Sequence, residues 1–331
     1  MYPATNGTAI RLRPDLGVMA YETMQNAPAF GFIAAKIVPY FKVATQSADF
    51  PVLPAKAAFA KGDVKRAPGA AYNRSSGEFE AGHYSCRERG HEVPVDDRFK
   101  AMYSSIIELE GAAINRCTDI VLRAFEMEVA TKLQKPANFN TLKATKPWSD
   151  PASDPKADIK AGKEKMRLKG VLPNTLIISW PIFQNLTAVK TVVEALDFLF
   201  PDRDKTGTIS LAHLEAYLDI KIELAGAMVD GGNRKKSVDL EDIWSDEVAT
   251  LACVSSPSAD VLEPSIGRTF LWNEGASDEI IVEDYPSNEA RAQIIRVRHD
   301  IDVRLLKSYD DDGNVLTDIS KNCGLILTHI K

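Results

Sequence analysis

The chain has 331 residues, of which 45% are hydrophobic and 26% are charged, a composition typical of a globular protein with one large or two ordinary domains. Its formal net charge of −6 argues against a dedicated nucleic-acid binder, whose surface is usually strongly basic, but not against passive contact with nucleic acid. No apolar run approaches the ~20 residues of a membrane span, and the N-terminal MYPATNGTAIRLRPDLG lacks the apolar core of a secretory signal. The four cysteines are scattered without a CxxC motif, which indicates a reducing cytoplasm and no disulfide framework.

The N-terminal part of the chain is predicted to be extended and poor in core residues. Residues 1–45 are irregular apart from a short helical patch near VMAYETMQ, and residues 46–97 are punctuated by prolines and glycines. Strand-like pieces in EFEAGHYSCRERGHEVPV indicate a long hairpin or arm. Because an isolated two-stranded hairpin is marginally stable in water, we expect this arm to lie against another surface, for which a neighbouring subunit is one candidate.

A long amphipathic helix is predicted over residues 104–134. Ser104 or Ser105 can cap its start, and Pro136 lies just beyond its end. At 1.5 Å per residue, a helix of about 30 residues spans roughly 45 Å, which is long for a globular domain. The apolar stripe lacks a strict heptad, so we expect a packed backbone helix rather than half of a coiled coil. Its members recur at steps of three and four: Ile106, Leu109, Ala113, Cys117, Ile120 and Ala124.

Alternating helices and strands follow a Pro/Ser/Asp-rich linker at residues 147–158. Helices are predicted in DIKAGKEKMRLKG, WPIFQNLTAVKTVVEALDFLF and LAHLEAYL, and strands in NTLIIS, IKIELAGAMV, DIWSDEVATLACV and RTFLW. This pattern predicts a compact α/β block over roughly residues 151–287.

The strongest strand signal lies in QIIRVRHDIDVRLL, residues 293–306. Apolar and charged residues alternate with a period of two, which predicts a long, half-buried strand. We expect its apolar face to cover the long helix and its charged face to point outward. The segment LILTHI near the C-terminus is predicted to return as its partner strand.

The segment FPDRDKTGTISLAHLEAYL, residues 200–218, partly matches an EF-hand calcium loop. Asp202 and Asp204 fall at alternate positions, and Gly207 occupies the position of the sharp turn. The position of the bidentate glutamate, however, holds His213, which cannot supply two hard oxygens. We therefore expect a turn between two helices, with Ser210 as the N-cap of the second, and no calcium site.

Motifs for cofactor binding and catalysis are missing from the sequence. It contains no GxxxxGK[ST], no GxGxxG after a strand, no GxSxG and no HExxH. His83, Cys86 and His91, with Glu88 between them, could form half of a zinc site, but such spacing arises easily by chance within an extended arm. We expect no metal, no cofactor and no catalytic residue.

Single ionisable residues within regular structure also have ordinary explanations. His299 falls on the apolar face of the predicted strand and is expected to be a buried imidazole with its hydrogen bonds satisfied. Glu126 and Glu128 are expected on the solvated face of the long helix. Nothing in these patterns requires catalysis.

The succession of segments resembles a tailed-bacteriophage major capsid protein, whose shell fold is shared with encapsulins. The segments that carry the resemblance are, in order, KIVPYFKV, FPVLP, VKRAPGAAYNRSS, SSIIELEGAAINRCTDIVLRAFEMEVATKL, PNTLIIS, TISLAHLEAYLDIKI, DIWSDEVATLACV, RTFLW and RVRHDIDVRLL. Each is a weak motif alone, and the specificity lies in their order along almost the whole chain.

The resemblance implies an α+β fold and gives names to its parts. Residues 1–45 would be an N-terminal arm, and residues 46–97 an extended loop that lies over a neighbouring subunit. Residues 98–150 would belong to a peripheral domain with the long helix as its spine, and residues 151–287 to an axial domain. Residues 288–331 would return to the peripheral domain.

The implied function is self-assembly into the icosahedral shell of a tailed phage. The expected partners are further copies of the chain in pentamers and hexamers, scaffolding, portal and decoration proteins, and packaged double-stranded DNA through non-specific contact, with no membrane. The protein would be made and assembled in the cytoplasm of the bacterial host and would reside in the virion capsid. An encapsulin-type protein cage is the alternative, and an α/β enzyme using the DRDKTG loop as a metal site is disfavoured by the missing motifs and the core-poor arm.

Charged residues on the predicted arm and the long strand are the candidates for contacts between subunits. On an exposed strand face, alternating charges are usually only solvated, but in a shell they could fix the register between neighbours. The candidates are Arg66, Arg87, Glu88, Arg89, Arg296, Arg298, Asp300, Asp302 and Arg304.

Overall fold

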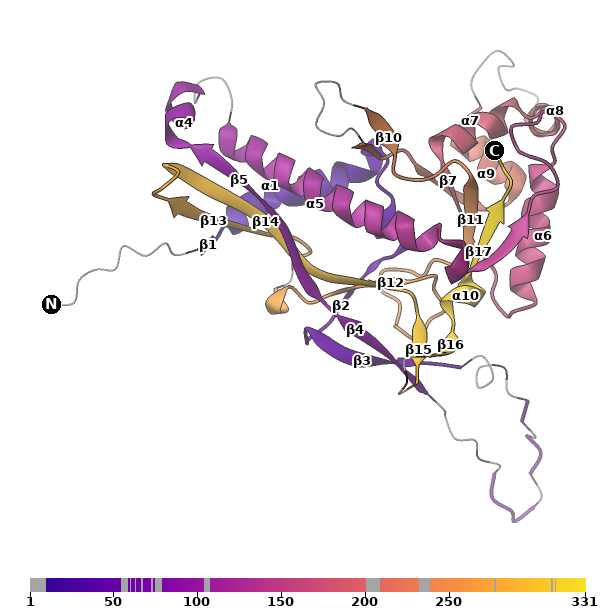
Figure 1. Cartoon of the computed structure of the whole chain (residues 1–331). Helices are drawn as coiled ribbons and strands as arrows, with labels where there is room; N and C mark the ends of the chain where they lie inside the picture. Colours follow the sequence, from indigo (N-terminus) through magenta and orange to yellow (C-terminus); the bar gives the residue numbers. More distant parts are fainter. Residues whose placement is uncertain are drawn as a thin grey trace.

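The structure is a computed structural model of the chain and describes residues 10–54, 59, 61–62, 64–66, 68–72, 74, 79–103, 108–200, 209–231, 239–276, 278–310, 312 and 314–331. The molecule is elongated (Figure 1). A large sheet and a long helix run from one end to the middle, and a second sheet with its helices forms a lobe at the other end.

The large sheet is built around the 13-residue strand β14 (Ala292–Arg304). On one side, β14 pairs antiparallel with β13 (Ile281–Ser287) and, further along, with β12 (Arg268–Leu271). On its other side it pairs antiparallel with β5 (Arg87–Asp96). The flanks are β1 (Arg11–Leu12) beyond β13 and β2 (Tyr40–Lys42), which runs parallel to β12.

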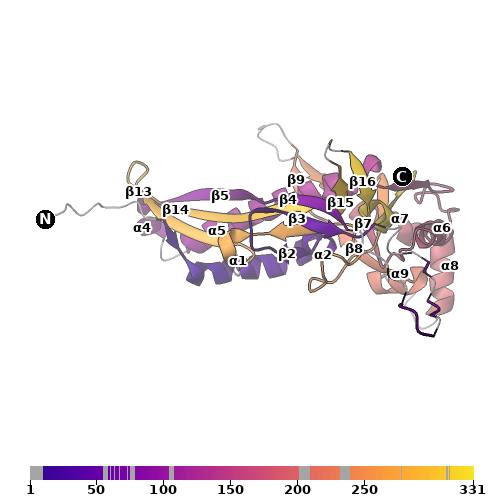
Figure 2. The same cartoon turned by 90° about the horizontal axis from the view of Figure 1, so that it is seen from below.

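The predicted long helix is present as α5 (Leu109–Leu133), which covers one face of the large sheet. Its residues Ile114 and Val121 pack against Ile295 and Val297 of β14. The helix is shorter than predicted, because a separate helix α4 (Asp97–Tyr103) precedes it and the expected caps at residues 104 and 105 lie outside the described residues. Helix α1 (Pro14–Asn26) lies alongside α5 (Figure 2).

The second sheet has five strands in the order β6-β17-β11-β7-β8. Four helices and an apolar core cover one of its faces, as predicted for the α/β block. The opposite face, which includes Ile177 and Ile326, packs against Val129 and Leu133 at the end of α5, so that the two lobes share a core. The strands are β6 (Asn140–Lys143), β7 (Thr175–Ser179), β8 (Lys221–Ala225), β11 (Val248–Ala252) and β17 (Gly324–Thr328), and the helices are α6 (Pro155–Arg167), α7 (Trp180–Ala188), α8 (Lys190–Leu199) and α9 (Leu211–Leu218).

Two strand assignments from the sequence were wrong. The C-terminal segment LILTHI does not pair with the long strand, because β17 lies between β6 and β11 in the second sheet. Strand β12, predicted from RTFLW as part of the α/β block at 151–287, belongs to the large sheet instead, as does β13, which falls within the same range. The chain leaves the second sheet after β11 and returns to it at β17, and period-two alternation carries no information on such distant pairings.

The segment that partly matches a calcium loop connects two helices at its described ends. Helix α8 ends at Leu199, and the Ser210 side chain accepts a hydrogen bond from the backbone N–H of His213 at the start of α9. The His213 ring in turn accepts from the Ser210 backbone, which completes a capping box. The expected N-cap is therefore confirmed, while residues 201–208 lie outside the described residues.

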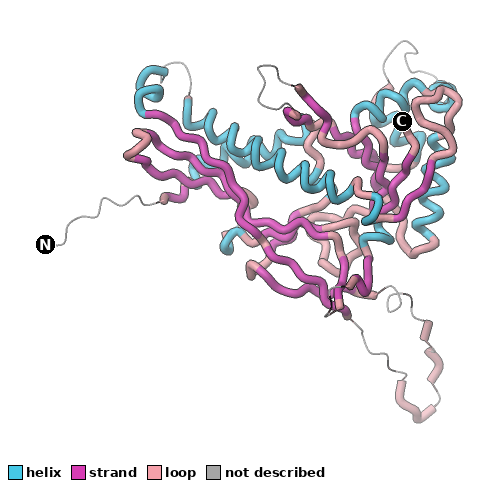
Figure 3. Tube along the Cα trace, viewed as in Figure 1, coloured by secondary structure: helices cyan, strands magenta, loops and turns pink. Residues whose placement is uncertain are grey.

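The predicted arm begins as a hairpin and ends as part of the large sheet. Strands β3 (Ser47–Val52) and β4 (Glu80–Ser85) form the antiparallel hairpin, which projects from the middle of the molecule in Figure 3. Next to it lies a second hairpin of β15 (Lys307–Tyr309) and β16 (Val315–Asp318). A third, smaller hairpin consists of β9 (Met228–Asp230) and β10 (Leu240–Asp242).

Candidate functional site

The charged residues of β14 form an internal network rather than an exposed face. The guanidinium of Arg298 donates from Nε and Nη2 to Glu283 on β13, at 3.0 and 2.9 Å, and from Nη2 to Glu274 at 3.0 Å. Arg296 donates to Glu92 of β5 at 2.5 Å and to Glu283 at 3.3 Å. Carboxylates on both neighbouring strands therefore neutralise the arginines of β14.

The expectation that this face points outward was wrong. Only 6% of Arg298, 3% of Asp300 and 8% of Asp302 is exposed. The strand lies in the middle of its sheet, so both neighbours contribute side chains that cover it. The turn at Asn273 also closes over it, because the Asn273 side-chain oxygen accepts a 2.7 Å hydrogen bond from the backbone of Asp300. Contacts made by these three residues are therefore internal to the protomer.

Negative charge accumulates around Asp300. In the register of β14 and β5, Asp300 lies directly opposite Glu88, and like charges in that position repel. Burial raises the pKa of the Asp300 carboxyl, although Arg298, 3.7 Å away, acts in the opposite direction. The Glu88 carboxylate is exposed and lies 3.9 Å from the Arg298 guanidinium.

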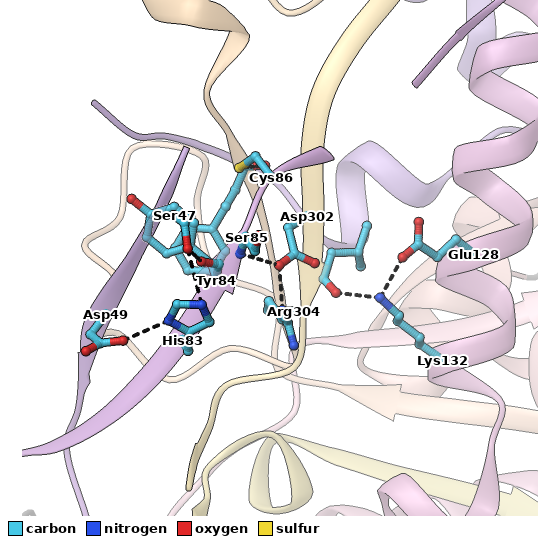
Figure 4. Close-up of polar contacts among 12 residues, drawn as sticks. Ser47, Asp49, His83, Tyr84, Ser85, Cys86, Glu128, Lys132, Asp302 and Arg304 are labelled. Atoms are coloured by element: carbon cyan, nitrogen blue, oxygen red, sulfur yellow. Dashed lines mark hydrogen bonds and ion pairs between the residues drawn. The ribbon is translucent and has the colours of Figure 1, made fainter. Parts of the chain in front are cut away.

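Asp302 connects the long strand to the hairpin. Its Oδ2 accepts a 2.8 Å hydrogen bond from the backbone N–H of Ser85 and a 2.6 Å hydrogen bond from Nε of Arg304 (Figure 4). The Arg304 side chain is partly exposed, whereas the carboxylate is almost covered. A carboxylate that holds a backbone N–H of β4 fixes the direction in which the hairpin leaves the sheet.

Aromatic packing anchors the base of the hairpin. The ring of Phe270 on β12 stacks on Tyr84 with a centroid distance of 4.6 Å and contacts Phe50 at 5.0 Å. A Cβ at Gly82 would come within 2.4 Å of the Phe50 ring, so only glycine permits this approach. Beyond this base, Arg66 is exposed, with Nε donating to the Ala70 carbonyl. A rigid base thus carries an exposed outer part.

The candidate zinc ligands of the arm do not converge. His83 is held by Asp49 at 2.8 Å and by Ser47 at 3.2 Å on the neighbouring strand (Figure 4). The Cys86 thiol is buried and points to the Phe270 carbonyl at 3.6 Å. In the part of the chain that the structure describes, no group of three or more His, Cys, Asp or Glu side chains is placed to hold a metal ion.

The two glutamates of α5 that were expected on a solvated face both form contacts with other residues of the protomer. Glu128 is half-buried and pairs with Arg89 of β5 and with Lys132, whose Nζ lies 2.6 Å from Oε1 (Figure 4). Burial raises the pKa of Glu128, but these two cations outweigh it and lower the pKa overall. Arg89 is therefore part of the contact between the sheet and the helix.

The expectation that Glu126 lies on the solvated face of the helix was wrong, because the residue is only 1% exposed. Its carboxylate accepts hydrogen bonds from the backbone of Ile33 at 3.0 Å and of Ala34 at 2.8 Å, and from the indole of Trp244 at 2.7 Å. The sequence contains a signal for this position, since Glu126 interrupts the apolar series Leu122, Val129 and Leu133 at helical spacing.

His299 is buried as expected, but one of its ring nitrogens is not satisfied. Nδ1 has no hydrogen-bond partner among the described residues, and the ring packs edge-on against Phe125 of α5. Burial and the nearby Arg89 lower the pKa of His299 to about 3, against a small opposing effect of Glu128. The imidazole is therefore neutral and forms part of the packed core.

Two grooves with exposed apolar residues mark surfaces suited to protein contacts. One, of about 400 Å³, lies between α4 and α5 beside the exposed Phe99 and Tyr103. The other, of about 560 Å³, lies between the lobes and is lined by the exposed Phe30, Trp180 and Met228. Among the described residues, the lining of neither groove includes a histidine, cysteine or serine that could act as a nucleophile or a general base.

The fold is that of several solved phage proteins. The chain is similar to a phage-related protein from Bordetella bronchiseptica RB50, with a TM-score of 0.71 and 21% identity, over 97% of this chain and 98% of that one. It is also similar to a virus-like particle from Pyrococcus furiosus (TM-score 0.55, 9% identity, 94% and 98% covered) and to the putative capsid protein of a prophage of E. coli CFT073 (TM-score 0.53, 9% identity, 97% and 99% covered). No protein-family model matches the sequence, and no curated protein sequence matches it significantly. The expected α+β fold is confirmed by these near-complete matches.

Within the described residues, no helix combines the length and the apolar character that a membrane span requires.

Proposed function

We propose that the chain is a major capsid protein that assembles into the icosahedral shell of a tailed phage. The observation that carries the proposal is the structural match over 97% of the chain to a phage-related protein and, over the same share, to the putative capsid protein of a prophage. A match of both lobes and of their connection is more informative than a match of one common domain.

The surface of the protomer supports a role in assembly. Large apolar side chains stand exposed at several separate edges, as expected for a subunit that meets neighbours on more than one side. Phe99 and Tyr103 lie on α4, Phe198 lies on α8 at the opposite end, and Phe30 and Trp180 flank the groove between the lobes.

Under this proposal, each part of the protomer corresponds to a part of a capsid subunit. The large sheet with α5 is the peripheral domain, and the second sheet with α6 to α9 is the axial domain, which surrounds the centre of a pentamer or hexamer. Residues 1–45 are the N-terminal arm, and the hairpin with its outer part is the extended loop that reaches a neighbour. Among the charged candidates, the exposed Arg66, Arg87 and Glu88 are available to that neighbour.

The proposed partners follow from the same role. They are other copies of the chain, scaffolding and portal proteins, decoration proteins and, by non-specific contact, packaged double-stranded DNA. The shell is assembled in the bacterial cytoplasm and becomes part of the virion. The role is structural and requires neither a cofactor nor catalysis.

An encapsulin-type protein cage is the second candidate. The observation in its favour is the similarity to the virus-like particle from Pyrococcus furiosus. Because the two candidates share a protomer fold, the contents of the shell distinguish them: DNA in a phage capsid and protein cargo in a cage.

The test is expression of the full chain in bacteria followed by size-exclusion chromatography and negative-stain microscopy. We expect closed particles of uniform diameter built from this chain. Nuclease-protected double-stranded DNA in particles from phage-producing cells supports the phage capsid, and a defined co-purifying protein supports the cage. A chain that stays monomeric over the whole accessible concentration range contradicts both.

A further inference from the structure

Two of the four cysteines lie opposite each other where the chain leaves the second sheet and returns to it. The last register pair of β11 and β17 is Ala252 with Gly324, and the next residues outward are Cys253 and Cys323. The backbone N–H of Cys253 donates a 2.8 Å hydrogen bond to the carbonyl of Cys323. The Cys253 thiol donates to the Pro264 carbonyl at 3.5 Å, and it also interacts with the thiol of Cys323.

The position of the pair suits a disulfide bond. The pair lies one position beyond the last ladder pair and keeps one of the two backbone hydrogen bonds of a hydrogen-bonded pair. In such a pair the side chains project to the same side and the Cα atoms lie about 5.5 Å apart. Disulfides require Cα separations of roughly 4.4–6.8 Å. The backbone around the pair is already fixed, because Cys253 also accepts a hydrogen bond from the N–H of Ile266 at 2.8 Å and Cys323 donates its N–H to Ile319 at 3.0 Å.

The two thiols differ in the way a reactive dithiol requires. The Cys253 side chain is partly exposed, whereas Cys323 is fully buried. The interaction between the two thiols lowers the pKa of Cys253 and, together with burial, raises that of Cys323. A reagent from solution therefore meets Cys253 first, as the better nucleophile.

The other two cysteines provide an internal comparison. Cys86 and Cys117 are buried singly, and their thiols face the carbonyl oxygens of Phe270 at 3.6 Å and Ile295 at 3.8 Å. Burial raises the pKa of Cys86 to about 12 and that of Cys117 to about 11. Both are expected to stay reduced under conditions that oxidise the pair.

We propose that Cys253 and Cys323 form a redox-sensitive pair that closes to an intramolecular disulfide in the presence of a small-molecule disulfide. The Cys253 thiolate attacks one sulfur of that oxidant, which forms a mixed disulfide and releases one reduced small thiol. The Cys323 thiol then loses its proton and attacks the Cys253 sulfur, which releases the second small thiol. Two protein thiols are oxidised to one disulfide while one small disulfide is reduced to two thiols.

The bond would close the part of the chain that contains the core of the large sheet. Residues 254–322 contain β12, β13 and β14, while both cysteines adjoin strands of the second sheet. Crosslinks that close long loops restrict the unfolded chain most, so oxidation stabilises the connection between the lobes. The biological consequence rests on the proposed function: a shell assembled with free thiols in a reducing cytoplasm would be reinforced after its release.

The experiment uses the purified full chain incubated with oxidised glutathione or with a reductant. Accessible thiols are counted after denaturation by maleimide labelling and mass spectrometry, and the crosslinked peptides are mapped. We expect oxidation to remove two of the four thiols, with Cys253 and Cys323 in one crosslinked peptide pair, and to raise the melting temperature by about 5 °C or more. Cys253→Ser should abolish both effects while the remaining thiols stay free.

Retention of four thiols, or a stable glutathione adduct on Cys253 without the crosslink, would overturn the proposal. A variant without the second thiol, Cys323→Ser, should trap the glutathione adduct on Cys253. If this polar substitution at a buried position prevents folding, Cys323→Ala serves the same purpose. The thiol count does not depend on particle formation. A negative result for the disulfide is therefore distinguishable from a negative result for the capsid assignment, which microscopy tests separately.

Discussion

Trp244 donates a 2.7 Å hydrogen bond from its indole nitrogen to Glu126, in the middle of the long helix α5. The same carboxylate accepts hydrogen bonds from the backbone of Ile33 and Ala34, at the start of helix α2 (Ala34–Ile37). One buried side chain therefore joins three segments that are far apart in the sequence, at the place where the two lobes meet. Burial raises the pKa of Glu126, while the three donors favour its ionised form and oppose that shift.

Replacement of Glu126 should be severely destabilising. In Glu126→Ala, the two backbone N–H groups and the Trp244 indole would lose their acceptor inside the core, and the cost should be about 3–5 kcal/mol of unfolding free energy. Urea denaturation measures the loss. Glu164→Ala is the control, because Glu164 is exposed and pairs with Arg167 on its own helix, so its replacement should leave the stability nearly unchanged. Equal effects at both positions would contradict the assigned role of Glu126.

The network on β14 predicts a large difference between two arginines of the same strand face. Arg298→Ala removes the buried partner of Glu283 and should cost about 3 kcal/mol or more. Arg304→Ala removes a partly exposed ion pair with Asp302, which keeps its hydrogen bond from Ser85, and should cost less than about 1 kcal/mol. Chemical denaturation of the two variants checks the ranking, and a harmless Arg298→Ala would show that the charged face is solvated after all.

The sequence predicted that β14 is a strand but not which residues of other segments cover its polar face. Period-two alternation predicted a strand at 293–306, close to the observed Ala292–Arg304, because the pleat places alternate residues on opposite faces. Whether the polar face meets water depends on Glu283 and Asn273, which alternation within the strand cannot reveal. The same limit applies to β17, whose partners β11 and β6 are far away in the chain.

Glu126 shows a different limit of the sequence interpretation. Its place in an apolar helical series was visible, yet the propensity of glutamate for exposed positions outweighed that signal. Only the three donors that surround it explain how a charged group is tolerated there. The strand-like pieces predicted in residues 78–95 correspond to β4 and β5, but their partners were not predicted. Strand β4 pairs with β3, and β5 pairs with β14 in the large sheet, although prolines and charges in RERGHEVPVD indicated an exposed arm.

The outer part of the hairpin should be required for assembly rather than for folding. A deletion of residues 60–90 would also remove β4 and the start of β5, which pairs with β14, so it would damage the protomer itself. Replacing only residues 61–74 with a short Gly/Ser linker retains the aromatic base. We expect the melting temperature of this variant to stay within about 2 °C of the unaltered protein, while microscopy shows no closed particles. Normal particles from the variant would refute the extended-loop assignment.

Exposed charges near the hairpin should control the rate of assembly through salt-dependent contacts. The double variant Arg66→Glu with Arg87→Glu changes two exposed residues and should leave the protomer's melting temperature nearly unchanged. Light scattering should show slower assembly at low salt and a smaller defect at high salt, because screening weakens repulsion between charges. The matched variant Arg66→Lys with Arg87→Lys keeps the charge and should assemble at the normal rate. Identical kinetics for both variants at low salt would leave these residues without a role at the interface.

His299 predicts a specific acid sensitivity of the protomer. Its pKa is lowered to about 3 by burial and by Arg89, whereas a histidine in the unfolded chain titrates near 6.5. Below pH 6.5 the unfolded state therefore binds a proton that the folded state excludes, so the folded state loses stability as the pH falls from 6.5 towards 3. At pH 5 this loss amounts to about 2 kcal/mol relative to pH 7.

Replacement of the imidazole should remove that contribution. His299→Leu and His299→Gln, one apolar and one polar, should each reduce the difference in unfolding free energy between pH 7 and pH 5 by about 2 kcal/mol, whatever their effect on stability at pH 7. Urea denaturation at the two pH values provides the measurement, and the comparison within each variant cancels the packing change against Phe125. Should both variants keep the full pH dependence of the unaltered protein, the role assigned to His299 would be contradicted, because the lowered pKa of Glu128 weakens the folded state mainly below about pH 5.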